Sequence, residues 1–214
     1  MGGARQVQAT SPTTRIICLT GKMAAGKNHI ASLMAGGDFP RALSDAICAC
    51  GAGIAAIDLD ETAHEAVALC APQILAAFSA EAARRGVTLT REDGSLDRRA
   101  LGKIVFSDKN LLARQESIVH PKITAMVSDF ISENTGKTIV LNATVLYKTP
   151  ELLSRCGAII FVRSCLIKRL LRARRRDKLP LRQILARLRN QRGLLAEYRK
   201  FARARGIPLL IVRN

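Results

Sequence analysis

The sequence has few aromatic residues, no tryptophan, and no apolar run long enough to cross a bilayer. Phe, Tyr and Trp make up 4% of the 214 residues, so the stacking surfaces that bind single-stranded nucleic acids are scarce. Residues 1–14 lack the apolar core of a signal peptide, and the apolar segments are shorter than the ~20 residues of a transmembrane helix. These absences predict a soluble, cytoplasmic protein.

The cysteines show no spacing typical of a zinc site. Two of them fall in predicted core strands, which favours buried thiols in a reducing compartment. The close pair at positions 48 and 50 could chelate a metal or be oxidised, but without a second pair or a nearby histidine we favour inert thiols. The six cysteines are Cys18, Cys48, Cys50, Cys70, Cys156 and Cys165.

Acidic residues are also scarce, with 17 Asp and Glu against 34 Lys and Arg, which gives a formal net charge of +17. Such a charge implies anionic partners, either phosphorylated small molecules or nucleic acid. The positive charge is concentrated toward the C-terminal side, in residues 168–176 and 187–205. A hydrophobic content of 48% excludes a disordered chain, and the length suits one domain with a sizeable core.

Short apolar runs recur along the chain and alternate with helical or mixed stretches. This alternation predicts an α/β fold, with a parallel sheet flanked by helices. We expect one domain over residues 14–214 after a flexible segment 1–13, with residues 34–53 left unassigned. The runs are residues 16–19, 54–57, 138–141, 158–162 and 208–212.

A long segment with few strand signals separates the second and third runs. Helical spacing in residues 61–83, 98–105 and 110–132 predicts a helical acceptor lobe, residues 61–136, inserted into the sheet domain. Gly86 and a turn at residues 92–95 interrupt it.

A glycine-rich loop lies between the first apolar run and the helix that follows it. Its glycines allow a tight turn that aims backbone N–H groups at the phosphates of a nucleoside triphosphate, at the positive end of the helix. Lys27 adds a point charge. The alternative is a chance match that caps an ordinary helix. The predicted phosphate-binding residues are Gly21, Lys22, Met23, Ala24, Ala25, Gly26, Lys27, Asn28 and His29.

Asn28 occupies the position where this motif usually has Ser or Thr, whose hydroxyl binds Mg²⁺. A carboxamide oxygen is also a hard ligand that suits this ion. We therefore predict Asn28 as the protein's magnesium ligand.

Two carboxylates, Asp58 and Asp60, end the second apolar run, and His64 follows in the next helix. In doubly wound folds the chemistry lies at the carboxyl ends of such strands. One carboxylate could accept a proton from an attacking hydroxyl while the other helps to hold hydrated Mg²⁺. The alternative is that Asp60 merely caps the helix beginning at Glu61.

Together these segments resemble the dephospho-coenzyme A kinases. The family shows an Asp-x-Asp element, here Asp58 to Asp60, and a Gly-x-Leu-x-Arg turn that leads into a helix ending Val-Phe, here residues 94–98 and 105–106. It also shows a His-Pro pair starting a helix, which corresponds to His120-Pro121, and an arginine-rich lid with a glutamine downstream, similar to residues 172–191. Each motif alone is weak evidence for this resemblance, but their order and spacing together are strong evidence.

The resemblance implies that residues 14–214 form a kinase domain of the P-loop NTPase type. It also implies the last step of coenzyme A synthesis, with ATP, Mg²⁺ and dephospho-coenzyme A as partners. We favour a monomer. Asp60 would be the general base on the ribose 3′-hydroxyl, and Lys27 would bind the transferring phosphoryl group. The lid, about residues 172–192, would bring its arginines onto the ATP phosphates. The implied lid and acceptor residues are Arg172, Arg176, Asp58, His64, Arg98 and His120.

These residues also have structural explanations. The lid arginines could belong to a solvated basic helix. His120 could hydrogen-bond to a backbone carbonyl, with Pro121 in the first helical turn.

The chain departs from the family pattern in three places, one of which is a longer connection over residues 34–53. Thr144 stands where the family has proline, and Lys148 lies near the family's acidic position. The family's adenine-contacting asparagine matches at most Asn214, the last residue.

Two other functions remain as alternatives to a dephospho-coenzyme A kinase. One is another P-loop small-molecule kinase, and the other is a basic nucleic-acid-binding protein with a vestigial loop.

Overall fold

The computed structural model describes residues 14–37, 53–177 and 180–214. The chain divides into two compact units: a sheet unit, residues 1–57 and 131–214, and a helical unit, residues 58–130. The segment 1–13 that we expected to be flexible, and most of the unassigned connection 34–53, lie outside the described residues. Within the described ranges no single helix is long and apolar enough to span a membrane, although one pair bent by 71° passes on length and composition.

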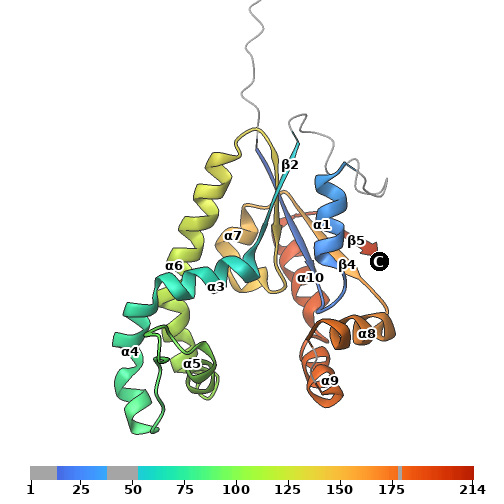
Figure 1. Ribbon diagram of the computed structural model, residues 1–214. Coiled ribbons are helices and arrows are strands. Elements are labelled where there is room, and N and C mark those ends of the chain that lie inside the picture. Colours follow the sequence, from blue (N-terminus) through green and yellow to red (C-terminus); the bar gives the residue numbers. More distant parts are fainter. Residues whose placement is uncertain (1–13, 38–52, 178–179) are drawn as a thin grey trace, which may run out of the picture. The chain divides into compact units, whose positions relative to one another are not determined.

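The sheet unit is built on a five-stranded sheet in the order β2-β3-β1-β4-β5 (Figure 1). The pairs β1–β3, β1–β4 and β4–β5 are parallel. The predicted parallel α/β fold is therefore confirmed, and each predicted apolar run overlaps a strand. The strands are β1 (Arg15–Gly21), β2 (Ile54–Asp58), β3 (Thr138–Asn142), β4 (Ala158–Arg163) and β5 (Leu209–Arg213).

Alternating residues of β1 face opposite sides of the sheet, as the strand period requires. Ile17 and Leu19 form one buried cluster with Ile30 of α1 (Lys27–Ala35). Cys18 faces the other side, where its thiol interacts with Tyr198 of α10 (Leu194–Arg205). Figure 1 shows α1 on one face and α7 (Pro150–Ser154) and α10 on the other. Helices therefore cover both faces, and the loops at the carboxyl edge remain available for ligands.

Two helices, α8 (Leu166–Asp177) and α9 (Leu181–Asn190), follow β4 and contain most of the segment 172–192 that is predicted as a lid. We refer to them as the lid helices. Buried Ala173, Ile184 and Leu188 form a small core between them. Met23 and Ala24 of the glycine-rich loop pack against this core, so the lid helices contact the loop directly.

The helical unit contains α3 (Leu59–Leu69), α4 (Ala71–Arg84), α5 (Arg98–Val105) and most of α6 (Lys109–Glu133). Ile74, Phe78, Leu101 and Ile104 are almost fully buried in its core. The helical stretch predicted for residues 61–83 is two helices, bent by 71° at Cys70. Pro72 in the first turn of α4 explains the break, because proline lacks an N–H group and clashes with the preceding turn.

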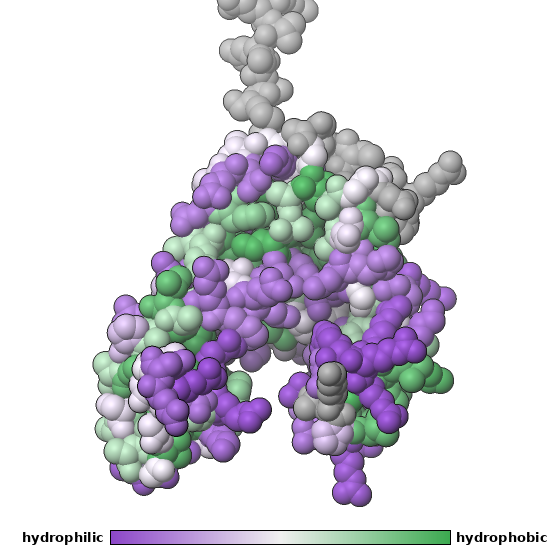
Figure 2. All heavy atoms as spheres, in the orientation of Figure 1, coloured by the Kyte–Doolittle hydropathy of each residue, from purple (hydrophilic) through white to green (hydrophobic). Residues whose placement is uncertain are grey.

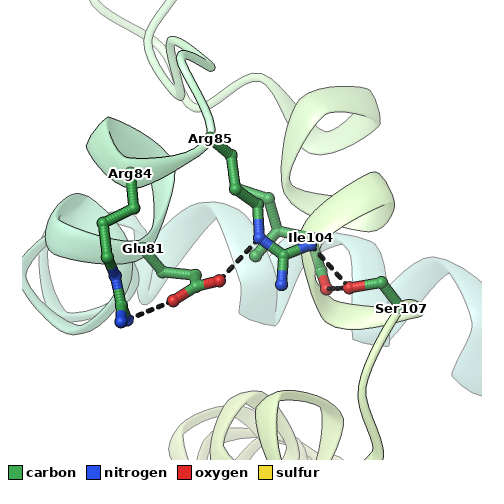
Figure 3. A network of polar contacts seen from close by, with 5 residues as sticks. All are labelled: Glu81, Arg84, Arg85, Ile104 and Ser107. Atoms are coloured by element: carbon green, nitrogen blue, oxygen red, sulfur yellow. Dashed lines mark hydrogen bonds and ion pairs between the residues drawn. The ribbon is translucent and has the colours of Figure 1, made fainter.

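A polar network fixes the ends of α4 and α5 relative to each other (Figure 3). Glu81 accepts hydrogen bonds from Arg84 and from Arg85 Nε, the latter at 2.6 Å. Arg85 Nη1 donates to Ser107 Oγ at 2.7 Å, and that hydroxyl donates to the Ile104 carbonyl at 2.7 Å. Exposed pairs of this kind contribute about 0–1 kcal/mol each, so the network orients the helices more than it stabilises them.

The expectation that Pro121 begins a helix is wrong. Helix α6 runs without interruption from Lys109 to Glu133, with Pro121 inside it. An internal proline costs about 3 kcal/mol through its missing N–H and its ring clash. Burial of the apolar side chains on either side of it offsets this cost, since Val119 lies in the core of the helical unit and Val127 is fully buried.

Candidate active site

The glycine-rich loop joins the end of β1 to the start of α1, as predicted. A Cβ at Gly21 would lie 2.6 Å from the Val162 carbonyl oxygen, so only glycine fits beside β4. Gly26 has φ 96°, and a Cβ there would lie 1.8 Å from Asn214 Nδ2. Ala24 also has a positive φ, 57°, a left-handed conformation that is strained for a residue with a Cβ and is concentrated at functional sites.

Lys27 is held by Thr144, which follows β3. Lys27 Nζ donates to Thr144 Oγ1 at 3.0 Å. The Thr144 carbonyl accepts from Thr20 Oγ1 at 3.2 Å and from the Tyr198 hydroxyl at 3.3 Å. The ammonium group is therefore positioned beside the loop by a threonine that is itself fixed from two sides.

Asn28 lies exposed in the first turn of α1, followed by exposed His29. Its Oδ1 accepts a hydrogen bond from Asn142 Nδ2 at 2.9 Å. A carbonyl oxygen has a second lone pair, and Mg²⁺ commonly takes one or two protein oxygens together with phosphate oxygens and water. The donor chemistry of Asn28 thus fits magnesium. Among the described residues no group of three or more His, Cys, Asp or Glu side chains could hold a metal ion.

Both backbone groups of Met23 form hydrogen bonds with residues of the lid region. Arg169 Nε donates to the Met23 carbonyl at 2.9 Å, and Gln191 Oε1 accepts from the Met23 N–H at 2.6 Å. Arg169 is only 6% exposed, and burial lowers its pKa. The sequence reasoning singled out Gln191 only as part of the lid motif and gave Arg169 no role.

The lid and the C-terminus meet at the carbonyl of Ala25. Arg172 Nη1 donates to this oxygen at 3.3 Å and Asn214 Nδ2 at 3.0 Å. Arg172 Nη2 also lies 3.5 Å from Asn214 Oδ1. Arg176, one turn later on α8, is exposed and pairs with Asp177, Nε to Oδ1 at 2.6 Å. This pair lowers the pKa of Asp177.

A cavity of about 410 Å³ opens beside Asn214. It is lined by the last residues of β4 and β5 and the start of α8, with Cys165 and Lys168 among them. It therefore adjoins the residue that contacts the glycine-rich loop.

In the helical unit, the cap of α3 is Asp58. Its side chain accepts from the Asp60 N–H at 3.0 Å, and the helix begins at Leu59. The alternative in which Asp60 caps a helix beginning at Glu61 is therefore wrong. Asp60 lies exposed in the first turn of α3, with His64 exposed one turn later.

The other predicted acceptor residues lie on α5 and α6. Arg98 is exposed at the first position of α5, where Asp97 caps the helix by accepting from the N–H groups of Arg99 and Ala100 at 2.9 and 3.0 Å. His120 is half-buried within α6.

Comparison with known proteins identifies a family. The family model for dephospho-CoA kinase matches residues 15–205. The dephospho-CoA kinase of Treponema denticola is 31% identical over 86% of this chain and 76% of its own length. That of Moorella thermoacetica is 32% identical over 88% and 81%.

Solved structures show the same fold. The protein TT1252 from Thermus thermophilus aligns with a TM-score of 0.68 at 25% identity, over 94% of this chain and 90% of its own. The dephospho-CoA kinase from Campylobacter jejuni aligns with a TM-score of 0.53 at 21% identity, over 94% and 88%.

Proposed function

The chain belongs to the dephospho-CoA kinase family, and from that membership we propose that it transfers the γ-phosphoryl group of ATP to the ribose 3′-hydroxyl of dephospho-coenzyme A. This reaction is the last step of coenzyme A synthesis. The observation that carries the proposal is the glycine-rich loop between β1 and α1, with Lys27 fixed on Thr144, in a chain that the family model matches over residues 15–205.

The donor side of the reaction belongs to the sheet unit. Backbone N–H groups of residues 21–29 would hold the phosphates of MgATP at the positive end of α1. Lys27 would lie on the transferring phosphoryl group and Asn28 on the magnesium ion, which neutralises charge on the phosphate oxygens. Arg172, held beside the loop at the Ala25 carbonyl, and Arg176 would add positive charge from the lid.

The cavity of about 410 Å³ beside Asn214 has a size typical of small-molecule sites, and we assign it to the adenine base of ATP.

The free thiols Cys18, Cys70 and Cys156 are buried, as expected for a cytoplasmic protein. We propose that the enzyme acts there as a monomer.

The acceptor side belongs to the helical unit. Because the Asp58 side chain caps α3, Asp60 is the carboxylate that we assign as general base. Arg98, exposed at the start of α5, suits the phosphate groups of dephospho-coenzyme A. Asp58, His64 and His120 complete the proposed acceptor site.

The chemical step follows from these roles. The 3′-oxygen attacks the γ-phosphorus while its proton passes to the Asp60 carboxylate. The bond from the γ-phosphorus to the β–γ bridging oxygen breaks, and ADP leaves with that electron pair. In such transfers most of the catalysis comes from positioning and charge neutralisation, which agrees with a site rich in N–H groups and cations.

The decisive experiment is an assay of the purified protein with ATP, Mg²⁺ and dephospho-coenzyme A that measures coenzyme A and ADP formed. We expect stoichiometric products. Lys27→Ala and Asp60→Asn should each lower kcat by about 10²-fold or more, while Asp60→Asn leaves ATP binding largely intact.

Matched controls are Lys200→Ala and Glu65→Gln, which change exposed side chains of α10 and α3 and should retain activity. Normal turnover by Asp60→Asn would remove the proposed base. A panel of other hydroxyl acceptors tests the remaining alternative, since faster phosphorylation of one of them would make the protein a different P-loop kinase.

A further inference from the structure

Phe106, in the helical unit, is an aromatic side chain that the fold leaves in solvent. It directly follows the last residue of α5 and is 78% exposed, the highest fraction among the exposed large apolar side chains of the described ranges. The other Phe and Tyr residues in these ranges are buried or half-buried. The ring of Phe106 therefore adds little to the core and is available to a ligand.

The backbone at Phe106 is held in place although the ring is exposed. The Phe106 N–H donates to the Gly102 carbonyl at 3.0 Å. The next residue, Ser107, accepts from Arg85 Nη1 at 2.7 Å and donates to the Ile104 carbonyl at 2.7 Å (Figure 3). The ring thus projects from a fixed point, which lowers the entropy lost when a ligand packs on it.

The surface next to the ring is open because Gly102 has no side chain. A Cβ at Gly102 would lie 3.7 Å from the ring atoms Cδ2 and Cε2 of Phe106. Glycine is unfavourable inside a helix, yet here it leaves room beside the ring for a flat group.

The same face of α5 carries positive charge. Arg98, Arg99 and Lys103 are all exposed, and residues three or four positions apart are neighbours on a helix surface. Lys103 therefore lies beside Phe106, and the two arginines lie one turn before Gly102 and Lys103. The opposite face of α5 is buried in the core of the helical unit. Figure 2 shows hydrophilic side chains gathered over the part of the helical unit where α5 lies.

We propose that Phe106 stacks on the adenine base of dephospho-coenzyme A, with Arg98, Arg99 and Lys103 facing its diphosphate. This inference rests on the proposed function. A purine base has a π face that stacks on an aromatic ring, and guanidinium groups match phosphate oxygens. The acceptor carries both groups on one ribose, the sugar that bears the reacting 3′-hydroxyl. Holding the base and the diphosphate therefore orients that hydroxyl, and Phe106 sets the specificity for a nucleotide acceptor.

Fluorescence tests the stacking directly. The chain has no tryptophan, so Phe106→Trp introduces a single indole fluorophore at the site. The donor site is first saturated with a non-hydrolysable ATP analogue and Mg²⁺. Dephospho-coenzyme A should then quench the indole, whereas the pantetheine phosphate half of the same molecule, which lacks the base, should not.

Kinetics test its contribution to acceptor binding. Phe106→Ala should raise KM for dephospho-coenzyme A by about tenfold, within the range for one base stacked on one aromatic ring, and leave KM for ATP unchanged. Its thermal midpoint should stay that of the wild type because the lost side chain is exposed. Phe106→Tyr keeps an aromatic ring and should restore the acceptor KM. Leu69→Ala removes another exposed apolar side chain of the helical unit and should have the wild-type KM.

Three results would overturn the proposal: an unchanged acceptor KM in Phe106→Ala, equal quenching by dephospho-coenzyme A and by its pantetheine phosphate half, or an equal rise of KM in Leu69→Ala. A failure of the proposed function is seen separately, because the wild type would then form no coenzyme A. Normal turnover by the wild type with a normal acceptor KM in Phe106→Ala removes the stacking site alone.

Discussion

Asn28 is the residue at which the site differs most from the usual phosphate-loop motif. Its Oδ1 already accepts a hydrogen bond from Asn142 at 2.9 Å, so any magnesium contact would use the second lone pair of the same oxygen. A threonine hydroxyl is both donor and acceptor and suits the same ion. We therefore expect Asn28→Thr to keep Mg²⁺-dependent activity within about threefold of wild type, or to raise it.

Steady-state kinetics at varied Mg²⁺ concentration check this expectation. Asn28→Leu, which has no oxygen, is the matched variant and should require more Mg²⁺ for half-maximal rate. Selective loss of activity in Asn28→Thr would show instead that the amide has a role that a hydroxyl cannot fill, such as the contact with Asn142.

Part of this site could be predicted from the sequence because its residues are contiguous. Residues 21–28 form one recognisable motif, and Asp58 and Asp60 follow an apolar run. Thr144 and Asn142 could not be assigned to Lys27 and Asn28 in the same way, because 117 and 114 positions separate the partners. Their proximity is a product of the β1–β3 pairing, which places the ends of two distant strands side by side.

The lid is the element that fixes the conformation of the glycine-rich loop. Gln191, just after α9, accepts from the Met23 N–H at 2.6 Å. In Gln191→Ala this N–H loses its acceptor and the loop is released from one side. We expect ATP binding to weaken by about tenfold, as loss of a partly buried hydrogen bond costs about 1–3 kcal/mol, with a smaller change in kcat.

Comparison of KM for ATP with kcat checks this prediction, because a loss of loop order acts mainly on nucleotide binding. Gln183→Ala removes the same side chain from an exposed position of α9 and is the control. An unchanged KM in Gln191→Ala would mean that Arg169 alone holds the loop.

At the level of elements, the strands were easier to predict than the helix boundaries. Apolar runs mark fully buried strands such as β3, whose residues are all buried. Helical periodicity in residues 61–83 and 110–132 gave the helices but not their limits. Pro72 breaks one helix while Pro121 is accommodated within another, and this difference depends on packing that the local sequence does not contain.

For the molecule as a whole, the net charge of +17 reflects 34 Lys and Arg residues against 17 Asp and Glu. Arg169 and Arg172 are bonded to carbonyl groups of the glycine-rich loop and not to carboxylates. The chain thus carries cations whose natural counter-ions are phosphates of its ligands, which agrees with a kinase of two phosphorylated substrates.

The stability of the whole molecule should fall at alkaline pH because buried acids stay protonated in the fold. Burial raises the pKa of the Cys156 thiol from 9.0 to about 12 and raises that of Cys18 as well. Above pH 9 the unfolded chain loses these protons while the folded chain keeps them, so the free energy of unfolding decreases between about pH 9 and 12. For Cys156 alone the decrease is on the order of 4 kcal/mol.

Urea unfolding at pH 8 to 11, with a reductant present, measures this slope. Cys156→Ala should give a shallower decrease than the wild type, and the difference between the two curves isolates the thiol from the titration of lysines. Cys165→Ala, at an exposed position, should follow the wild-type curve. Parallel curves for wild type and Cys156→Ala would mean that the Cys156 thiol ionises as readily in the fold as in the unfolded chain, and that its burial at the end of α7 is incomplete in solution.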